Sequence, residues 1–410
     1  MLKKLAIPSL LLAIVSLGFT INHSDLADDW GFFGHKRINR LSIFTLPPSL
    51  FGFYKKNVEY ITEHAVDPDK RRYATVHEGV RHYIDLDHWG EYPYDNVPRT
   101  FSDAVRKYLK LSHISPAGDT TQMDLIYSQD KPDLLEVKYR RKTFNISQFQ
   151  FDKFYKTKIF NNQAYYEGPW TFPVSELQNN WKMDFQVPEG SLHFEDGFSE
   201  YGILPYNMLD YQNKLTAAFV AMNPESILRI SADFGHYIGD AHVPLHTTSN
   251  YNGQLTNQLG IHAFWESRIP ELLADKQWDF FVGQADYIEE PASYFWDIVL
   301  ASNRLVDSVL SVEKRLSNEF PEDSQFCQDL RNGNPVRTQC ADYTAAFDEA
   351  MGGMVEDRMC ASILSIGSCW YTAWVDAGRP DLSELYLEGA TQVEELEIEP
   401  SVTPFRAHEN

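Results

Sequence analysis

The apolar residues of this chain recur mostly at steps of three or four, which predicts a predominantly helical protein. The clearest case runs from Pro224 towards His242, and Pro244 ends it because proline lacks the backbone donor that a helix needs. Its buried stripe is formed by Ile227, Ile230, Phe234 and Ile238. The same spacing predicts further helices over residues 35–46 and 48–66, and near 261–274, 292–318 and 341–376.

Residues from about 95 to 200 follow a different pattern. The stretch "KTFNISQFQFDKFYKTKIF" alternates polar and aromatic residues, and glycine and proline are scattered through the rest. We expect an irregular insertion here, with room for a short hairpin. The predicted fold class is therefore mostly α: one helical domain that carries a long irregular, part-β insertion.

The N-terminus has the pattern of a secretory signal peptide. Lys3 and Lys4 precede an apolar run that is short for a membrane span, and an uncleaved anchor is the alternative interpretation. We expect a signal peptide over residues 1–27, a single domain over 28–380 and an acidic tail over 381–410. An exported protein, periplasmic or extracellular, with no stable membrane span after processing would result.

Charge and cysteine usage narrow the possible partners. The chain has 36 basic and 58 acidic residues, a net charge of −22, which disfavours a long nucleic-acid footprint and binding to anionic lipid.

Cys327 and Cys340 bracket a polar loop and can pair after export. Cys360 and Cys369 lie in a helical pattern, too far apart to bridge, and we expect buried thiols. No protein partner can be inferred.

Five chemistry-bearing residues occur within 31 positions. His236 and Asp240 are four apart on the helix that begins at Pro224, His246 follows its end, and His262 and Glu266 repeat the four-residue spacing. Buried core histidines are the structural alternative. Imidazole and carboxylate ligands without thiolate are typical of hydrolytic zinc, with manganese or iron as alternatives. Spacing alone cannot choose among further candidates upstream: His35, His64, Asp67, Asp69, His77, His82, Asp85, Asp87 and His88.

Several of these segments together resemble one known family. "HYIGDAHVPLH" followed by "HAFWE" resembles the signature of the zinc-dependent phospholipase C and S1/P1 nuclease superfamily. "WGFFGH" resembles the mature N-terminus of that superfamily, and "HYIDLD" resembles its middle histidine motif. The matched motifs span roughly residues 30–87 and 204–377, and the insertion between them is not covered.

The resemblance implies two to three zinc ions and a set of ligands for each. An aspartate is expected about fifteen residues before His82, and Asp67 fits that spacing better than Asp69. The first zinc would then be held by Asp67, His82, His236 and Asp240. The second would be held by His246, His262 and Glu266, and the third by His35, Asp240 and the amino group and carbonyl of an N-terminal Trp30. His242 would not be a ligand.

The implied activity is hydrolysis of a phosphodiester, with Asp67 also orienting or deprotonating the attacking water. Glu266 and the gap of 16 residues between His246 and His262 resemble the phospholipases C, whereas the close pair Trp30 and His35 resembles the nucleases. We expect a phospholipase C that releases diacylglycerol and a phosphorylated head group. The alternatives are a nuclease acting on single-stranded nucleic acid and a non-catalytic zinc-binding or surface-interaction protein.

Overall fold

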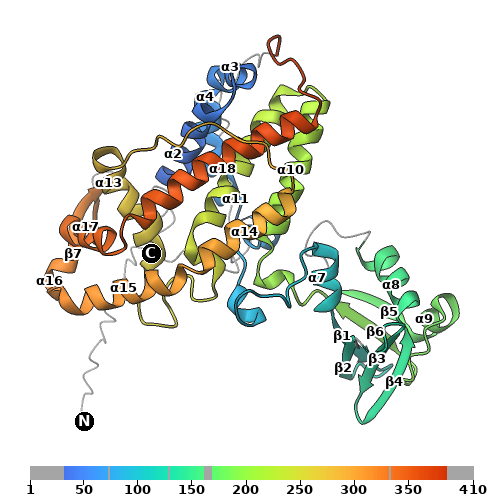
Figure 1. Ribbon diagram of the computed structural model, residues 1–410. Helices are drawn as coiled ribbons and strands as arrows, with labels where there is room; N and C mark the ends of the chain where they lie inside the picture. Colours follow the sequence, from blue (N-terminus) through green and yellow to red (C-terminus); the bar gives the residue numbers. More distant parts are fainter. Residues whose placement is uncertain (1–31, 73, 128–129, 161–168, 332–333, 386–410) are drawn as a thin grey trace, which may run out of the picture.

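The computed structural model describes residues 32–72, 74–127, 130–160, 169–331 and 334–385, in which a helical body carries a smaller sheet-containing lobe (Figure 1). The expected signal peptide and Trp30 lie outside these residues. The predicted mostly helical fold class is confirmed at this level. Within the described residues no helix has the length and apolar character that crossing a bilayer requires.

The helical body contains a set of longer helices and a set of short helices and helical turns. Its longer helices are α2 (Phe32–Ser42), α3 (Pro48–Lys56), α10 (Leu204–Val220), α11 (Pro224–His242), α13 (Ile269–Gln277), α14 (Pro291–Asn303), α15 (Val306–Glu319), α17 (Ala341–Ala350) and α18 (Met354–Asp376). Its shorter turns are η1 (Ile43–Thr45), α4 (Val58–Glu63), η2 (His64–Val66), α5 (Asp67–Arg72), α6 (Val76–Gly79), η3 (Leu86–Trp89), η6 (Ser199–Tyr201), η7 (Pro244–Thr247), α12 (Ile261–Ala263), η8 (Phe264–Arg268) and α16 (Glu322–Gln325).

Helix α11 lies at the centre of this body. It begins where the side chain of Asn223 accepts a hydrogen bond from the backbone N–H of Ser226, at 2.8 Å, with Pro224 in the first turn. It packs against α2, α10, α14 and α18, and every residue from Ser231 to His242 is buried. Because this part of α11 is enclosed all round, its polar residues are held inside the protein rather than at its surface.

The predicted helices agree with the structure except at their breaks. The stretch near 341–376 is interrupted by Gly352 and Gly353, whose positive φ angles of 68° and 79° end α17 and start α18. The stretch near 292–318 divides into α14 and α15. Helix α10 was not among the predicted helices, although Met208, Tyr211 and Leu215 recur at helical spacing on its buried face.

The insertion is not irregular, and it contains far more β-structure than the short hairpin that the sequence predicted. After α7 (Phe101–Lys107) the chain forms an antiparallel sheet in the order β4-β3-β2-β1-β6-β5. The strands are β1 (Lys110–Ile114), β2 (Thr120–Tyr127), β3 (Leu134–Tyr139), β4 (Lys142–Ser147), β5 (Trp170–Pro173) and β6 (Ser191–Glu195). Helices α8 (Gln148–Phe154), with the π-helical turn η4 (Tyr155–Ile159) after it, and α9 (Val174–Trp181) complete the lobe.

The lobe has a hydrophobic core of its own. Strand alternation places Leu135, Val137 and Tyr139 of β3 on one face, where they join Phe151 and Phe154 of α8. The other face carries exposed polar residues such as Gln122, Asp124, Lys138 and Asn145. This pattern is that of an antiparallel sheet with one packed and one solvated face.

A second, two-stranded sheet lies at the far side of the helical body. It pairs β7 (Phe326–Arg331) with β8 (Asn334–Gln339), and the predicted disulfide between Cys327 and Cys340 is present at its base. Cys360 and Cys369 are not bonded to each other; Cys369 is buried as expected, and Cys360 is only half-buried.

Candidate metal centre

The centre is built around two residues of α11 that are one turn apart. Both His236 and Asp240 are buried, and Nε2 of His236 lies 3.4 Å from Oδ2 of Asp240. Nδ1 of His236 donates to the carbonyl of Ala65, at 2.9 Å, so its Nε2 lone pair points into the centre. The four-residue spacing read from the sequence therefore does bring the two side chains to one point.

His82 and Asp69 complete the first group. Nδ1 of His82 lies 2.9 Å from Oδ2 of Asp240 and 3.1 Å from Nε2 of His236. Oδ1 of Asp69 lies 3.8 Å from Nδ1 of His82 and 3.7 Å from Nε2 of His236. His82, His236 and Asp240 thus form one group of donor atoms, and Asp69 forms an overlapping group with His236 and His35. Imidazole nitrogens and carboxylate oxygens are donors that a divalent ion such as zinc takes.

The structure brings Asp69, and not the predicted Asp67, to this group. Asp67 instead bonds Nδ1 of His64 at 2.5 Å and lies 3.5 Å from Nζ of Lys70. Both aspartates belong to α5, where positions two apart point to opposite sides of the helix, so only one of them can face His236. The geometry therefore favours Asp69 over Asp67, the aspartate that motif spacing had indicated, as a member of this group.

The second group consists of His246, His262 and Glu266. Oε2 of Glu266 lies 2.7 Å from Nε2 of His262 and 3.6 Å from Nε2 of His246. The π-helical turn η8 carries Glu266, and such turns occur frequently at functional sites. Nδ1 of His262 donates to the carbonyl of Tyr251, at 3.1 Å, which fixes the ring with Nε2 towards Glu266.

His35 lies between the two groups. Its Nε2 is 3.4 Å from Oδ1 of Asp240 and 3.2 Å from Oε1 of Glu266. The approach depends on Gly239, because a Cβ atom there would lie 2.7 Å from Cδ1 of Ile38 and 3.1 Å from Nδ1 of His35. Two of the three residues expected at the third site, His35 and Asp240, are therefore close together, and Glu266 joins them. The third expected residue, Trp30, lies outside the described residues.

Burial sets the charge of these groups. It lowers the pKa of His82, His236 and His246, so their imidazoles are neutral and have a lone pair to offer. Burial, with the nearby charges of Asp69 and Glu266, raises the pKa of Asp240 well above its usual range. Burial also acts to raise the pKa of Glu266, but hydrogen bonds from His246, His262 and His35 hold it well below its usual range.

The other sequence candidates have structural roles elsewhere. Asp87 accepts hydrogen bonds from the backbone and hydroxyl of Ser249, at 2.8 and 2.5 Å, and His88 stacks on Tyr201. His242 is buried and joins none of the groups, since Nδ1 donates to the carbonyl of Ile238 at 2.8 Å and Nε2 faces Ser365. His77 and Asp85 likewise join none of the groups formed by the described residues.

The aromatic residues next to Glu266 belong to the core. Phe264 and Trp265 are each 2% exposed, and Phe264 packs against Tyr343 and Phe347 of α17. Both rings are therefore part of the hydrophobic core beside the second group.

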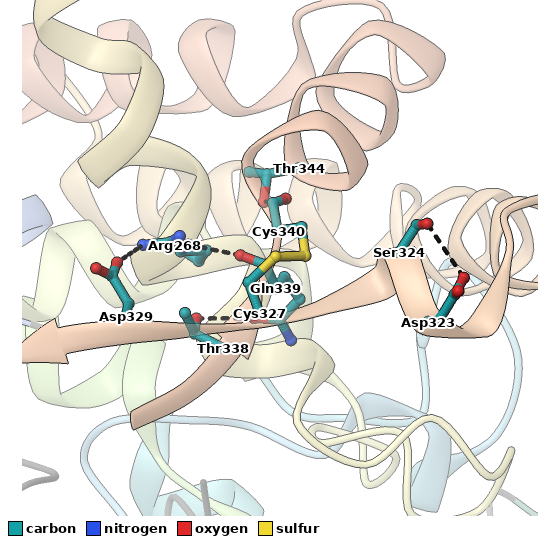
Figure 2. The surroundings of a disulfide bond; sticks show 9 residues. All are labelled: Arg268, Asp323, Ser324, Cys327, Asp329, Thr338, Gln339, Cys340 and Thr344. Atoms are coloured by element: carbon teal, nitrogen blue, oxygen red, sulfur yellow. Dashed lines mark hydrogen bonds and ion pairs between the residues drawn. A yellow bond between two sulfur atoms is a disulfide. The ribbon is translucent and has the colours of Figure 1, made fainter. Parts of the chain in front are cut away.

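The disulfide hairpin supports the second group from outside. Figure 2 shows Arg268 beside the hairpin and in contact with both strands: Nε donates to the carbonyl of Gln339, at 3.1 Å, and Nη1 donates to Oδ2 of Asp329, at 3.1 Å. Arg268 is two residues from Glu266 on the same π-helical turn. The hairpin closed by Cys327 and Cys340 is thereby connected to a carboxylate of the centre, a connection that no sequence signal had indicated.

Taken together, buried histidines, aspartates and a glutamate form overlapping groups that could hold metal ions, with the donor atoms of each group within 4.8 Å of one another. Their nitrogen and oxygen donors fit a borderline divalent ion. Comparisons of this chain with models of protein families, with curated proteins and with solved structures found no match.

Proposed function

We propose that this protein is a zinc-dependent phosphodiesterase of the phospholipase C type, with the fold of the superfamily that its motifs resemble. The observation that carries the proposal is the position of Asp240, whose two oxygens face different groups: Oδ2 faces His82 and Oδ1 faces His35. Ions bound on either side of one carboxylate lie close together, and closely spaced ions are the arrangement used for hydrolysis of phosphate esters.

The proposed ligands follow from the geometry and the resemblance together. One zinc is assigned to Asp69, His82, His236 and Asp240, and a second to His246, His262 and Glu266. A third is assigned to His35 with Asp240 and Glu266, and an N-terminal Trp30 would complete it. The disulfide between Cys327 and Cys340 supports export to an oxidising compartment, periplasmic or extracellular.

Bound zinc would supply Lewis acidity that activates water and offsets the charge of a phosphate diester. The chain itself would position the reactants. Asp69 and Glu266 are the carboxylates of the centre that reach solvent, at 16% and 13% side-chain exposure, so they can accept a hydrogen bond from an incoming water. Arg72, whose Nη2 lies 3.6 Å from Oδ1 of Asp69, helps to orient that carboxylate. The role that motif spacing gave to Asp67 passes to Asp69.

Phospholipid is proposed as the substrate in preference to nucleic acid. A polynucleotide takes much of its affinity from lysine and arginine contacts to its phosphates, and this chain has a net charge of −22. Glu266 and the short gap between His246 and His262 add to this preference through the resemblance. The alternative, an S1/P1-type nuclease, is favoured by one observation, the spacing of Trp30 and His35.

The test is a side-by-side assay of zinc-loaded protein on short-chain phosphatidylcholine and on single-stranded DNA, with the Asp240→Asn variant as inactive control. We expect diacylglycerol and phosphocholine from the lipid, with little cleavage of the DNA. Strong DNA cleavage to 5′-phosphate ends without lipid turnover would establish the nuclease alternative. Zinc bound at the centre with turnover of neither substrate would indicate a non-catalytic binding protein.

A further inference from the structure

A long segment beside the metal centre has no charged side chain. Between Asp240 and Glu266 there is no Asp, Glu, Lys or Arg, although such residues make up 23% of the chain. The central part of this segment, residues 247–260, connects His246 to the short helix that carries His262. We call residues 247–260 the neutral loop.

The neutral loop is held in shape by its own amides. The side chain of Asn250 accepts from the backbone N–H of Leu255, at 2.8 Å, and that of Asn252 accepts from the backbone N–H of Gly260, at 3.0 Å. The side chain of Gln258 donates to the carbonyl of Leu310 on α15, at 2.9 Å. All three amide side chains are buried, so the loop has a defined shape without an apolar core.

Two leucines project from this fixed loop into solvent. Leu255 is 70% exposed and Leu259 is 72% exposed. Leu259 is three residues from His262, which limits the distance between their Cα atoms to about 11 Å. Apolar side chains that a rigid loop holds in water, next to a reaction centre, indicate an apolar contact made during function.

The chemistry of the loop selects the kind of partner. A polynucleotide or an anionic membrane needs cations, and the loop has none. A stable protein dimer buries roughly 800 Å² per partner, far more than two leucine side chains provide. An electrically neutral lipid surface needs only apolar side chains that enter the head-group region. The charged residues that hydrogen-bond the loop from outside, Asp87, Glu313 and Lys314, include a single cation and so form no basic patch.

We propose that the neutral loop docks this protein onto zwitterionic phospholipid surfaces by inserting Leu255 and Leu259 among the lipids. This inference rests on the proposed function and deepens it, since it gives the protein a way to reach lipid in a bilayer. His246 and His262 of the second metal group flank the neutral loop in the sequence, so the docked surface would adjoin both histidines.

The test measures binding of the zinc-loaded protein to vesicles of a phosphonate analogue of phosphatidylcholine, which cannot be hydrolysed. We expect the double variant Leu255→Asn, Leu259→Asn to bind at least tenfold more weakly than the wild type. The matched control is Val220→Asn, which is 66% exposed at the end of α10, near the start of α11 and so roughly 24 Å along that helix from Asp240. Its binding should equal that of the wild type.

Three results would overturn the inference. They are equal binding by the double variant and the wild type, absence of wild-type binding, and tighter binding when anionic lipid is added to the vesicles. Should the double variant not fold, the Leu259→Trp variant gives the answer by fluorescence. Brominated phosphatidylcholine vesicles should quench its emission more than that of the wild type, and equal quenching would contradict insertion.

The proposed function is tested separately, with dissolved monomers of short-chain phosphatidylcholine. Monomer hydrolysis without vesicle binding would leave the phospholipase proposal standing and remove the docking loop. Vesicle binding through the two leucines without hydrolysis of any lipid would do the reverse. A change of oligomeric mass in the double variant, with vesicle binding unchanged, would assign the leucines to contact between copies of the chain and overturn the inference.

Discussion

Nε2 of His35 lies 3.4 Å from Oδ1 of Asp240, although the two residues come from helices α2 and α11, which lie far apart in the sequence. The other oxygen of the same carboxylate lies 2.9 Å from Nδ1 of His82. A single buried side chain therefore contacts histidines of two separate groups. Asp240 reaches both histidines with one negatively charged group, so we expect it to be the most sensitive position to change.

The Asp240→Asn variant should lose the most metal and activity. An amide keeps the size of the carboxylate but removes its charge from both groups, so we expect at least one zinc to be lost and activity to fall roughly 100-fold or more. Elemental analysis and the lipid assay measure both effects. The His242→Asn variant is the control, and equal losses in the two variants would show that the ligand assignment is wrong.

The neighbouring aspartates of α5 give a second contrast. Asp69→Asn should weaken zinc binding by about 10- to 100-fold, because its Oδ1 faces both His82 and His236. Asp67→Asn should change the affinity for zinc by less than a few-fold, since Asp67 is hydrogen-bonded to His64 instead. Competition with a zinc chelator of known affinity ranks the two. The opposite order would restore Asp67 as the ligand.

His242 should make the stability of the protein depend on pH. Burial, with the charge of Arg358, lowers the pKa of His242 to about 3, below its usual 6.5. Because the unfolded chain takes up a proton at 6.5 and the folded protein does not, this residue's contribution is complete above pH 6.5. It is lost as pH falls from 6.5 towards about 3, at up to about 1.4 kcal/mol per pH unit.

Urea unfolding at pH 7 and pH 5 measures that dependence. The His242→Asn variant should lose less stability between the two pH values than the wild type, because it lacks the proton uptake at this position. An identical pH dependence in both proteins would contradict a neutral, buried His242.

Reduction of the disulfide should destabilise the protein and loosen the second metal group. Cys327 and Cys340 are 13 residues apart, and closing a loop of that length contributes about 3 kcal/mol. The Cys327→Ser, Cys340→Ser variant should unfold at lower temperature and bind its zinc less tightly, since Arg268 anchors the hairpin beside Glu266. Calorimetry and zinc titration test this. Unchanged zinc affinity at lowered stability would limit the hairpin to a structural role.

The sequence predicted best what depends on local periodicity. The four-residue spacings of His236 with Asp240 and of His262 with Glu266 fix which side chains meet, whatever the surrounding packing. Spacing did not indicate that Asp69, and not Asp67, lies near His236, because this depends on how α5 is turned relative to α11. That orientation is set by tertiary contacts, such as the pair of Arg71 with Asp233, and leaves no mark on spacing.

The sheet of the lobe was missed for a related reason. Its strands are short, and although the alternating strand β3 pairs with its chain neighbours β2 and β4, the pairing of β1 with β6 joins strands that lie far apart in the chain. Helix α10, which was not predicted, does have a local signal in the helical spacing of its apolar residues Met208, Tyr211 and Leu215. The break between α17 and α18 could also have been predicted, because Gly352 and Gly353 are adjacent glycines, which readily adopt positive φ.

The pairing of β1 with β6 has a consequence for how this protein can vary. Lys110 at the start of the lobe and Glu195 at its end are register partners, so the chain enters and leaves the lobe at neighbouring points. The rest of the backbone would need only a turn of a few residues to close that gap. The lobe, with its separate core, is thus an exchangeable module: evolution or an engineer can resize, swap or delete it without rerouting the chain that holds the metal ligands.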